Sequence, residues 1–188
     1  MIVLASASPR RGEILLNAGI PYSREVPDGV DETPEPGEDP REYVMRLARA
    51  KAGAIAANAD RIVLGADTTV VIDGRIFGKP SDESDAARML RNLSGRAHEV
   101  MTGFCLMDRG GVVIDSATTR VWFATLSEQE IESYVASGEP MDKAGAYGIQ
   151  KLGSRFVTRV EGCYFNVMGL PISLVYSHLR RMNPGFML

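Results

Sequence analysis

The sequence predicts an α/β fold of the mixed (α+β) kind, with helices and strands in one domain. Segments typical of strands alternate with segments typical of helices along the whole chain. The length of 188 residues suits one hydrophobic core, or one domain with two lobes. The sequence contains no internal repeat and no inter-domain linker. We therefore expect a single domain over residues 1–188.

The first half of the chain carries two helix-start signals. An apolar run is followed by a turn and by Pro9, a residue suited to the first helical position. Farther on, Asp39 and Pro40 with Glu42 three residues after the cap predict a second helix start. The predicted elements are a strand at 2–4, a helix from Pro9, an extended segment at 22–30, a loop at 31–38 and a helix from Pro40 to about residue 57.

The second half is divided by turn residues. Asp73-Gly74 predicts a hairpin turn, and Ser127 with Glu130 predicts a capping box at a helix start. Residues 139–154 are Gly-rich without periodicity, which is typical of a functional or mobile loop. The predicted elements are a strand at 61–66 continued at 69–72, a helix at 81–93, paired strands at 99–107 and 112–123, a helix at 127–138, a strand at 156–160, a helix at 171–182 and a loose tail.

Composition excludes several classes of protein. The chain is 45% hydrophobic and 24% charged, with a formal net charge of −3, which gives no field for non-specific nucleic-acid binding. It has no apolar run long enough for a membrane span and no signal-peptide pattern. Cys105 and Cys163 lie far apart without CxxC spacing, so we expect two buried thiols, no disulfide framework and no zinc site. A cytoplasmic location fits these features.

Two hydroxyls and two arginines gather at the first predicted helix start, in the run Ser6-Ala7-Ser8-Pro9-Arg10-Arg11. A helix N-terminus presents unpaired N–H groups and a partial positive charge. Adjacent guanidinium groups add planar donors for phosphate oxygens. The run therefore indicates a site for a polyanion, most simply a phosphate chain. The alternative is an ordinary helix start whose arginines face solvent.

Two charged residues interrupt apolar segments. Lys51 projects from the apolar stripe of the second predicted helix, either at its edge or into a cleft. Asp67 interrupts a nearly continuous apolar run, where a carboxylate is costly unless it is paired, hydrogen-bonded or bound to metal. A strand-end Asp that caps a turn is the alternative for Asp67.

Three further polar residues have weaker signals. Lys79 precedes Pro80, so its backbone is expected to be extended. Glu32 lies in the acidic loop, where a solvent-facing side chain is the simpler interpretation. His98 follows a Gly-Arg turn and is interpreted as a hydrogen-bonded structural histidine. The sequence has no P-loop, no GxGxxG, no nucleophile elbow and no His/Cys metal cluster.

The chain resembles the Maf family of nucleotide pyrophosphatases over essentially its whole length. The motifs that carry this resemblance occur in the family's order. They are LASASPRR at 4–11, VDE at 30–32, RLA at 46–48 with KA at 51–52, LGADT at 64–68, GKP at 78–80, LSG at 93–95, MTG at 101–103, DKAGAYGIQ at 142–150 and VMGLP at 167–171.

The resemblance implies an elongated mixed sheet flanked by helices, two lobes with a central cleft, and the architecture of the inosine triphosphate pyrophosphatases. It implies hydrolysis of a nucleoside triphosphate between the α- and β-phosphates, with Mg²⁺ or Mn²⁺ as a divalent cofactor. It also implies a house-cleaning role in nucleotide metabolism, a homodimer and, in some members, an effect on cell division and septum formation. No nucleic acid or membrane partner is expected.

The resemblance also suggests roles for single residues. Ser8, Arg10 and Arg11 would grip phosphate oxygens, with Lys51 and Lys79 approaching from the other side. Asp67 would act as general base or metal ligand, with Glu32 helping to hold the metal or the water. Arg11, Thr68 and Gln150 match the branch that acts on dTTP and UTP, and Thr68 with Gln150 would recognise the base.

Two alternatives stay open from the sequence. One is the same fold with a different nucleotide as substrate, either 7-methyl-GTP or a modified purine nucleotide. The other is a nucleotide-sensing, septum-regulating binding protein with little turnover. Retention of Asp67, Lys51 and Lys79 favours an enzyme.

Overall fold

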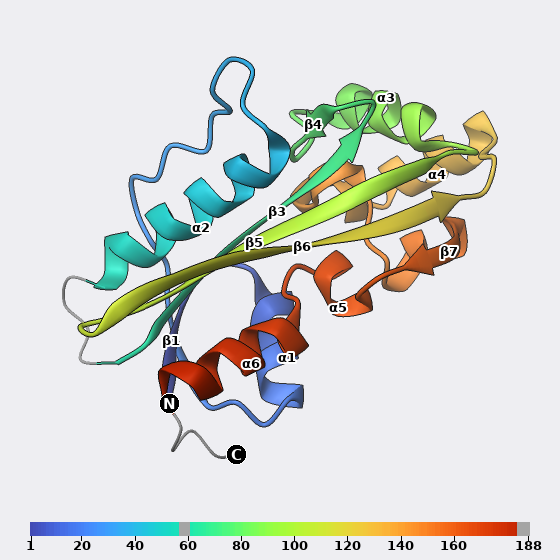
Figure 1. The fold of residues 1–188 in the computed structure, drawn as a ribbon. Coiled ribbons are helices and arrows are strands. Elements are labelled where there is room, and N and C mark those ends of the chain that lie inside the picture. Colours follow the sequence, from blue (N-terminus) through green and yellow to red (C-terminus); the bar gives the residue numbers. More distant parts are fainter. Residues whose placement is uncertain (57–60, 184–188) are drawn as a thin grey trace. The chain divides into compact units, whose positions relative to one another are not determined.

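A computed structural model describes residues 1–56 and 61–183, and within them a seven-stranded mixed sheet is flanked by helices (Figure 1). The strand order is β2-β1-β3-β5-β6-β7, with β4 paired to β3. The strands are β1 (Ile2–Ala5), β2 (Tyr22–Glu25), β3 (Val63–Ile72), β4 (Arg75–Phe77), β5 (Ala97–Asp108), β6 (Gly111–Phe123) and β7 (Val157–Glu161). The mixed α/β fold that the sequence predicts is confirmed.

The α-helices are α1 (Pro9–Asn17), α2 (Pro40–Ala56), α3 (Glu83–Leu93), α4 (Glu128–Ala136), α5 (Tyr164–Val167) and α6 (Ile172–Met182). Three 3₁₀ turns occupy the late stretch that the sequence predicts as a loop: η1 (Glu139–Asp142), η2 (Ala144–Ala146) and η3 (Lys151–Phe156). None of the helices in the described residues is long and apolar enough to cross a membrane.

The chain divides into two compact units. The first unit contains residues 1–67, 102–117 and those from 169 onward, and the second contains residues 68–101 and 118–168. In the first unit, a core cluster of Val3, Ala5, Ala48, Ala52, Val63 and Cys105 joins α2 to the sheet. In the second, α3 and α4 pack over a larger core that includes Phe123, Tyr134 and Phe156.

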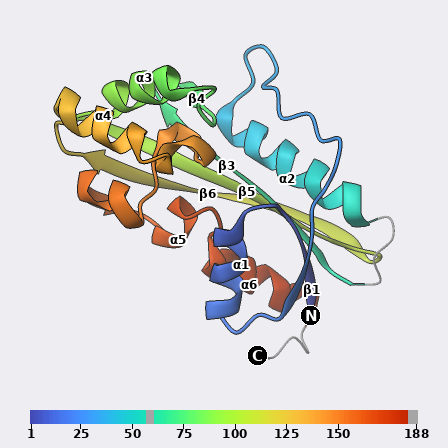
Figure 2. The same ribbon diagram turned by 180° about the vertical axis from the view of Figure 1, so that it is seen from behind.

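Strands β2, β1 and β3 of the first unit are parallel, with Ala5 opposite Gly65. Helix α2 covers one face of this part of the sheet, and α1 with α6 covers the other (Figure 1). The view from behind shows the loop before α2 running beside that helix (Figure 2). The carboxyl end of β1 therefore leads into α1 beside β3, an edge where α/β folds commonly bind ligands.

Two glycines let α2 approach the sheet very closely. A Cβ on Gly65 would clash with the Ala48 carbonyl and lie 2.6 Å from the Ala52 nitrogen. A Cβ on Gly103 would lie 2.5 Å from the Val44 carbonyl carbon. These neighbours are helix backbone, which cannot rotate away as a side chain can. Small residues on β3 and β5 are therefore required for this packing distance.

Most predicted elements are confirmed, with shifts at their ends. The hairpin turn is present, with φ of 51° at Asp73 and 72° at Gly74. The Ser127 capping box is also present. The extended segment ends earlier than predicted, at Glu25, and α3 starts at Glu83 with Asp82 as its cap. The short helix α5 was not predicted, and most of the predicted tail lies outside the described residues.

The cysteine prediction is correct for one residue and wrong for the other. Cys105 is buried in the first core, and burial raises the pKa of its thiol to about 11. Cys163 is partly exposed because it occupies the cap position of α5, where its amide donates to Thr119 Oγ1. Both cysteines are free thiols, as predicted.

Candidate active site

Three charged side chains of the first unit converge on one nitrogen. Lys51 Nζ lies 2.6 Å from Asp67 Oδ1 and 2.6 Å from Glu32 Oε1. The side chains of Lys51 and Asp67 are only 10% and 11% exposed, whereas that of Glu32 is 50% exposed. One ammonium group thus joins a buried carboxylate to a carboxylate that reaches solvent.

The local sequence explains this convergence. Alternate residues of a strand share a face, so Asp67 points to the same side as Gly65, toward α2. Lys51 follows Leu47 and Ala48 by one helical turn and lies on the buried face of α2. Asp67 lies inside β3 and not at its end, so the turn-capping alternative is wrong. Of the three conditions under which a buried carboxylate is tolerated, the structure shows pairing and hydrogen bonding for Asp67.

Burial and charge act in opposite directions on Asp67. Burial raises the pKa of Asp67, while the charges of Lys51 and Arg11 lower it. Burial likewise lowers the pKa of Arg11, whereas the charge of Asp67 raises it, Arg10 lowers it and Glu32 raises it. Arg11 of the N-terminal motif therefore lies within electrostatic range of Asp67 and Glu32.

The N-terminal motif forms the start of α1 as predicted, with Ser8 as the cap residue and Pro9 in the first turn. The Ser8 amide donates to Ser6 Oγ at 3.2 Å. Arg11 is buried, and it donates through Nε to the Gly169 carbonyl at 2.8 Å and through Nη1 to Ser6 Oγ at 3.0 Å. Arg11 thus ties this loop to the segment before α6, and its contact with phosphate stays a prediction.

The remaining predicted site residues belong to the second unit. Thr68 follows Asp67 directly on β3 and is partly buried. Lys79 is exposed, and the carbonyl of Gly78 before it accepts from the Gly145 amide at 3.0 Å. Gln150 is extended and precedes η3. The Lys79 segment is therefore bonded to the late stretch that carries Gln150, while a role beside Asp67 stays a prediction for Lys79 and Gln150.

His98 is a structural residue, as predicted. It is 2% exposed, and its Nε2 lies 2.7 Å from the Tyr147 hydroxyl. Its ring packs edge-on against Phe123 and Tyr147. Burial lowers the pKa of His98 to about 4, so the imidazole is neutral at pH 7.

Sequence reasoning missed the residues that hold Glu32. The Tyr43 hydroxyl donates to the Glu32 carbonyl, and Arg46 binds Glu38 on the same loop. One signal was available, because Tyr43, Leu47 and Lys51 are spaced by four residues and share one face of α2. Ser6 and Gly169, which hold Arg11, lie in motifs that carry the resemblance, but their pairing is not encoded locally.

The comparisons with known proteins decide the family. The family model described as "Maf-like protein" matches residues 1–182. The chain belongs to the Maf family. A Koribacter versatilis protein named dTTP/UTP pyrophosphatase is 54% identical over 181 residues, which cover 96% of this chain and 93% of that protein. The dTTP/UTP pyrophosphatase of Vibrio cholerae is 53% identical over 173 residues, covering 91% and 92%.

A solved structure supports the fold. The Ham1 protein of Staphylococcus aureus aligns over 97% of this Maf-family chain and 99% of its own, with a TM-score of 0.56 and 17% identity. At that identity the likeness concerns the fold alone. It agrees with the mixed sheet flanked by helices described above.

Proposed function

We propose that this chain is a nucleoside triphosphate pyrophosphatase that hydrolyses dTTP and UTP, and modified pyrimidine triphosphates, to the monophosphate and pyrophosphate. Relatives that are 53–54% identical to this chain are named dTTP/UTP pyrophosphatases. The structural observation that carries the proposal is the Lys51 ammonium held between Asp67 and Glu32. That cluster supplies a base and a cation, and Arg11 at the start of α1 lies within electrostatic range of both carboxylates.

Each group of the first unit has a role in the proposed reaction. Water attacks phosphorus as the bridging P–O bond between the α- and β-phosphates breaks, and the water proton passes to Asp67. Lys51, Arg10 and Arg11 stabilise the negative charge that develops on the phosphate oxygens. Ser8 and the amides at the start of α1 bind the phosphate chain. Pyrophosphate leaves as the second product.

A divalent cation fits the donor set. The described residues contain no group of three His, Cys, Asp or Glu side chains that could hold a metal unaided. Asp67 and Glu32 already share one cation, the Lys51 ammonium. Mg²⁺ or Mn²⁺ needs one or two carboxylates because phosphate oxygens and water supply its other ligands. When bound by Asp67 and Glu32, the metal would neutralise phosphate charge.

Base recognition is assigned to the second unit. Gln150 carries both a donor and an acceptor, and Thr68 carries a hydroxyl, so together they can match a pyrimidine edge. A site built on such hydrogen bonds rejects a base that leaves them unmade. A cytoplasmic homodimer with a house-cleaning role completes the proposal.

Product analysis tests this function. The purified chain is incubated with dTTP, UTP, dCTP, ATP and 7-methyl-GTP, with Mg²⁺ or with EDTA, and products are separated by ion exchange. We expect dTMP and UMP in equimolar amounts with pyrophosphate, and no turnover in EDTA. Release of orthophosphate, preference for 7-methyl-GTP, or tight binding without pyrophosphate would each contradict the proposal. The last outcome would identify a nucleotide sensor.

A further inference from the structure

Glu32 lies in a segment that has no regular secondary structure. It lies between β2 and α2, in residues 26–39, which form neither helix nor strand. Half of its side chain is exposed, yet its carboxylate lies 2.6 Å from Lys51 Nζ. Solvent screens the Glu32 side of this pair, so the contact holds the loop weakly by itself. Something else must therefore hold this loop where Glu32 meets Lys51.

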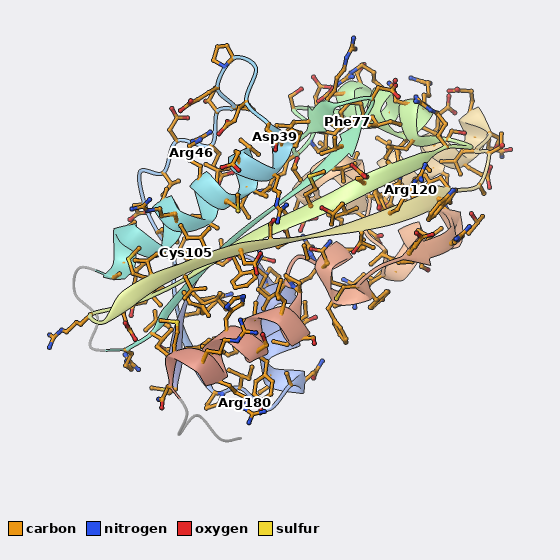
Figure 3. The ribbon with its side chains drawn as sticks, viewed as in Figure 1. Asp39, Arg46, Phe77, Cys105, Arg120 and Arg180 are labelled. Carbon is orange, nitrogen blue, oxygen red and sulfur yellow. The ribbon has the colours of Figure 1, made fainter. Side chains whose placement is uncertain are left out.

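The loop is bound to α2 through Arg46. Its Nε lies 2.6 Å from Glu38 Oε1, and its Nη2 lies 2.8 Å from Glu38 Oε2. The same Nη2 donates to the Thr33 carbonyl at 3.1 Å. Arg46, labelled in Figure 3, points from α2 toward the loop. A bidentate guanidinium fixes both distance and orientation, so it holds the loop at two points.

This ion pair differs from an ordinary surface pair. The Glu38 side chain is 8% exposed and that of Arg46 is 32% exposed. Arg46 lowers the pKa of Glu38, and Glu38 raises the pKa of Arg46. Glu38 Oε2 also accepts from the Glu35 amide at 3.0 Å, so the carboxylate folds the loop onto itself. Arg46 therefore binds Thr33, the residue next to Glu32, directly, and it reaches Glu35 through Glu38.

Tyr43 fixes Glu32 itself. Its hydroxyl donates to the Glu32 carbonyl at 2.9 Å, and the Arg46 guanidinium lies 5.6 Å from the centre of its ring. Tyr43 and Lys51 are eight residues apart on one face of α2. The same helix therefore binds the backbone of Glu32 through Tyr43 and its carboxylate through Lys51.

We propose that Arg46, Tyr43 and Glu38 form a clamp that positions the Glu32 carboxylate on the Lys51–Asp67 pair. These three are positioning residues, because they act on the reaction through Glu32. The inference rests on the proposed function for the role of Glu32. It adds three positioning residues to those proposed for the reaction. A small displacement of a positioned group can cost about a hundredfold in rate.

The first test measures turnover of dTTP by Arg46→Gln, Arg46→Lys, Glu38→Gln and Tyr43→Phe. We expect Arg46→Gln to lower kcat by roughly tenfold to hundredfold, as loss of a ligand-orienting partner does, with KM within about twofold. Arg46→Lys should recover part of the loss because it keeps one charged contact. Glu38→Gln should lower kcat as much as Arg46→Gln does. The double variant Arg46→Gln/Glu38→Gln should lose no more, because both changes break the same ion pair.

The matched control is Arg91→Gln. Arg91 binds Glu128 through Nε and Nη2, the same chemistry in the second unit. It should leave kcat and KM unchanged. An Arg46→Gln variant with normal kcat, or an equal loss in Arg91→Gln, would overturn the clamp. Independent, additive losses from Arg46→Gln and Glu38→Gln would do the same.

The second test needs no nucleotide. Amide hydrogen exchange of Arg46→Gln should lose protection at Glu35, whose amide is held by Glu38, while α2 and β3 keep theirs. Unchanged exchange in the loop, or lost protection throughout the first unit, would refute a local positioning role. Because this measurement does not depend on turnover, it separates failure of the clamp from failure of the proposed function.

Discussion

The two units differ in the charge that they bury. In the described part of the first unit, the charged side chains of Arg11, Lys51 and Asp67 are buried, along with the neutral Ser6 and Thr102. In the second, the buried polar residues are Thr69, His98, Thr119 and Asn166, and the neutral His98 binds Tyr147. Buried charge is expensive and is retained where chemistry needs it, whereas neutral hydrogen bonds fix shape.

The loops that carry predicted site residues repeat this contrast. Glu38 holds the Glu32 loop through a guanidinium, which is a charged donor. Glu139 holds the Gln150 loop through neutral donors, the amides of Leu152 and Gly153 and the Tyr134 hydroxyl. Under the proposed function, the first unit would supply the electrostatics of phosphate cleavage and the second would hold the residues that read the base. Each prediction below tests one side of this division.

Asp67→Asn should have the largest effect. The amide keeps the shape but cannot accept a proton as the carboxylate does, so kcat for dTTP should fall by roughly 10²–10⁴-fold. Circular dichroism should show an intact fold. Asp115→Asn is the control, because Asp115 is also in the first unit and pairs with His178 at 2.9 Å. Near-native turnover in Asp67→Asn would remove the catalytic assignment.

Gly65→Ala should have the second largest effect, on both the stability of the first unit and kcat. The added methyl meets the backbone of α2 at Ala48 and Ala52, so the helix must move away from β3. We expect a loss of about 1–3 kcal/mol in the free energy of unfolding, together with a fall in kcat, because Lys51 moves with the helix. Urea unfolding and steady-state kinetics measure the two effects.

Gly53→Ala on the same helix is the matched control, since a Cβ there meets nothing within 4 Å. It should stabilise the protein by about 0.5–1 kcal/mol, because alanine favours helix over glycine. Equal effects from the two substitutions would mean that the close approach of α2 is not what places Lys51.

The buried neutral His98 of the second unit should make the folded protein less stable at low pH. Burial lowers the pKa of His98 to about 4 in the fold, below its value in the unfolded chain. As pH falls below about 6.5, the unfolded chain takes up a proton that the folded chain does not. His98 should therefore reduce the free energy of unfolding by about 2 kcal/mol at pH 5, at 1.36 kcal/mol per pKa unit.

His98→Phe isolates this contribution, because phenylalanine keeps a ring against Phe123 and Tyr147. The variant starts less stable, since the Tyr147 hydroxyl loses its partner, so the comparison is between slopes. Urea unfolding from pH 7 to pH 4.5 should show a shallower decline in the variant. Identical slopes would mean that folding does not lower the pKa of His98.

Local signals were enough for much of the fold and for the centre of the site. Capping residues and hairpin turns act over a few residues, so Asp73-Gly74 and Ser127 with Glu130 identified their elements directly. Asp67 and Lys51 stood out because each breaks an apolar pattern, and the structure pairs them. A broken rule of this kind is visible in one sequence because the cost of burying a charge is general.

The contacts of Arg11 and Glu139 were not predictable, because they join segments that are not adjacent in the sequence. Arg11 binds the carbonyl of Gly169, which is 158 residues away, and no local pattern encodes that contact. The late stretch was predicted as an irregular loop, yet it forms three 3₁₀ turns. The Glu139 carboxylate binds the amides of Leu152 and Gly153, and Ala146, Tyr147 and Phe156 pack in the core of the second unit. A single acidic residue gives no sequence signal for such a role.

Glu139→Gln should have the smallest effect and the most specific one. Its carboxylate accepts from the amides of Leu152 and Gly153 and from the Tyr134 hydroxyl, at 3.0–3.2 Å. Glutamine offers one acceptor oxygen, so at least one of these bonds is lost and Gln150 is held less firmly. We expect KM for dTTP to rise about threefold to tenfold, the cost of roughly one neutral hydrogen bond, with kcat unchanged.

The exposed Glu132→Gln on α4 is the control and should change neither constant. A competition assay between dTTP and 7-methyl-GTP adds the readout that a general loss of stability would not move. If the second unit recognises the base, Glu139→Gln should reduce the preference for dTTP over 7-methyl-GTP. The kcat for bound nucleotide should not change. A fall in kcat without a change in preference would instead place Glu139 with the electrostatics of the first unit, and the division between charged and neutral units would fail.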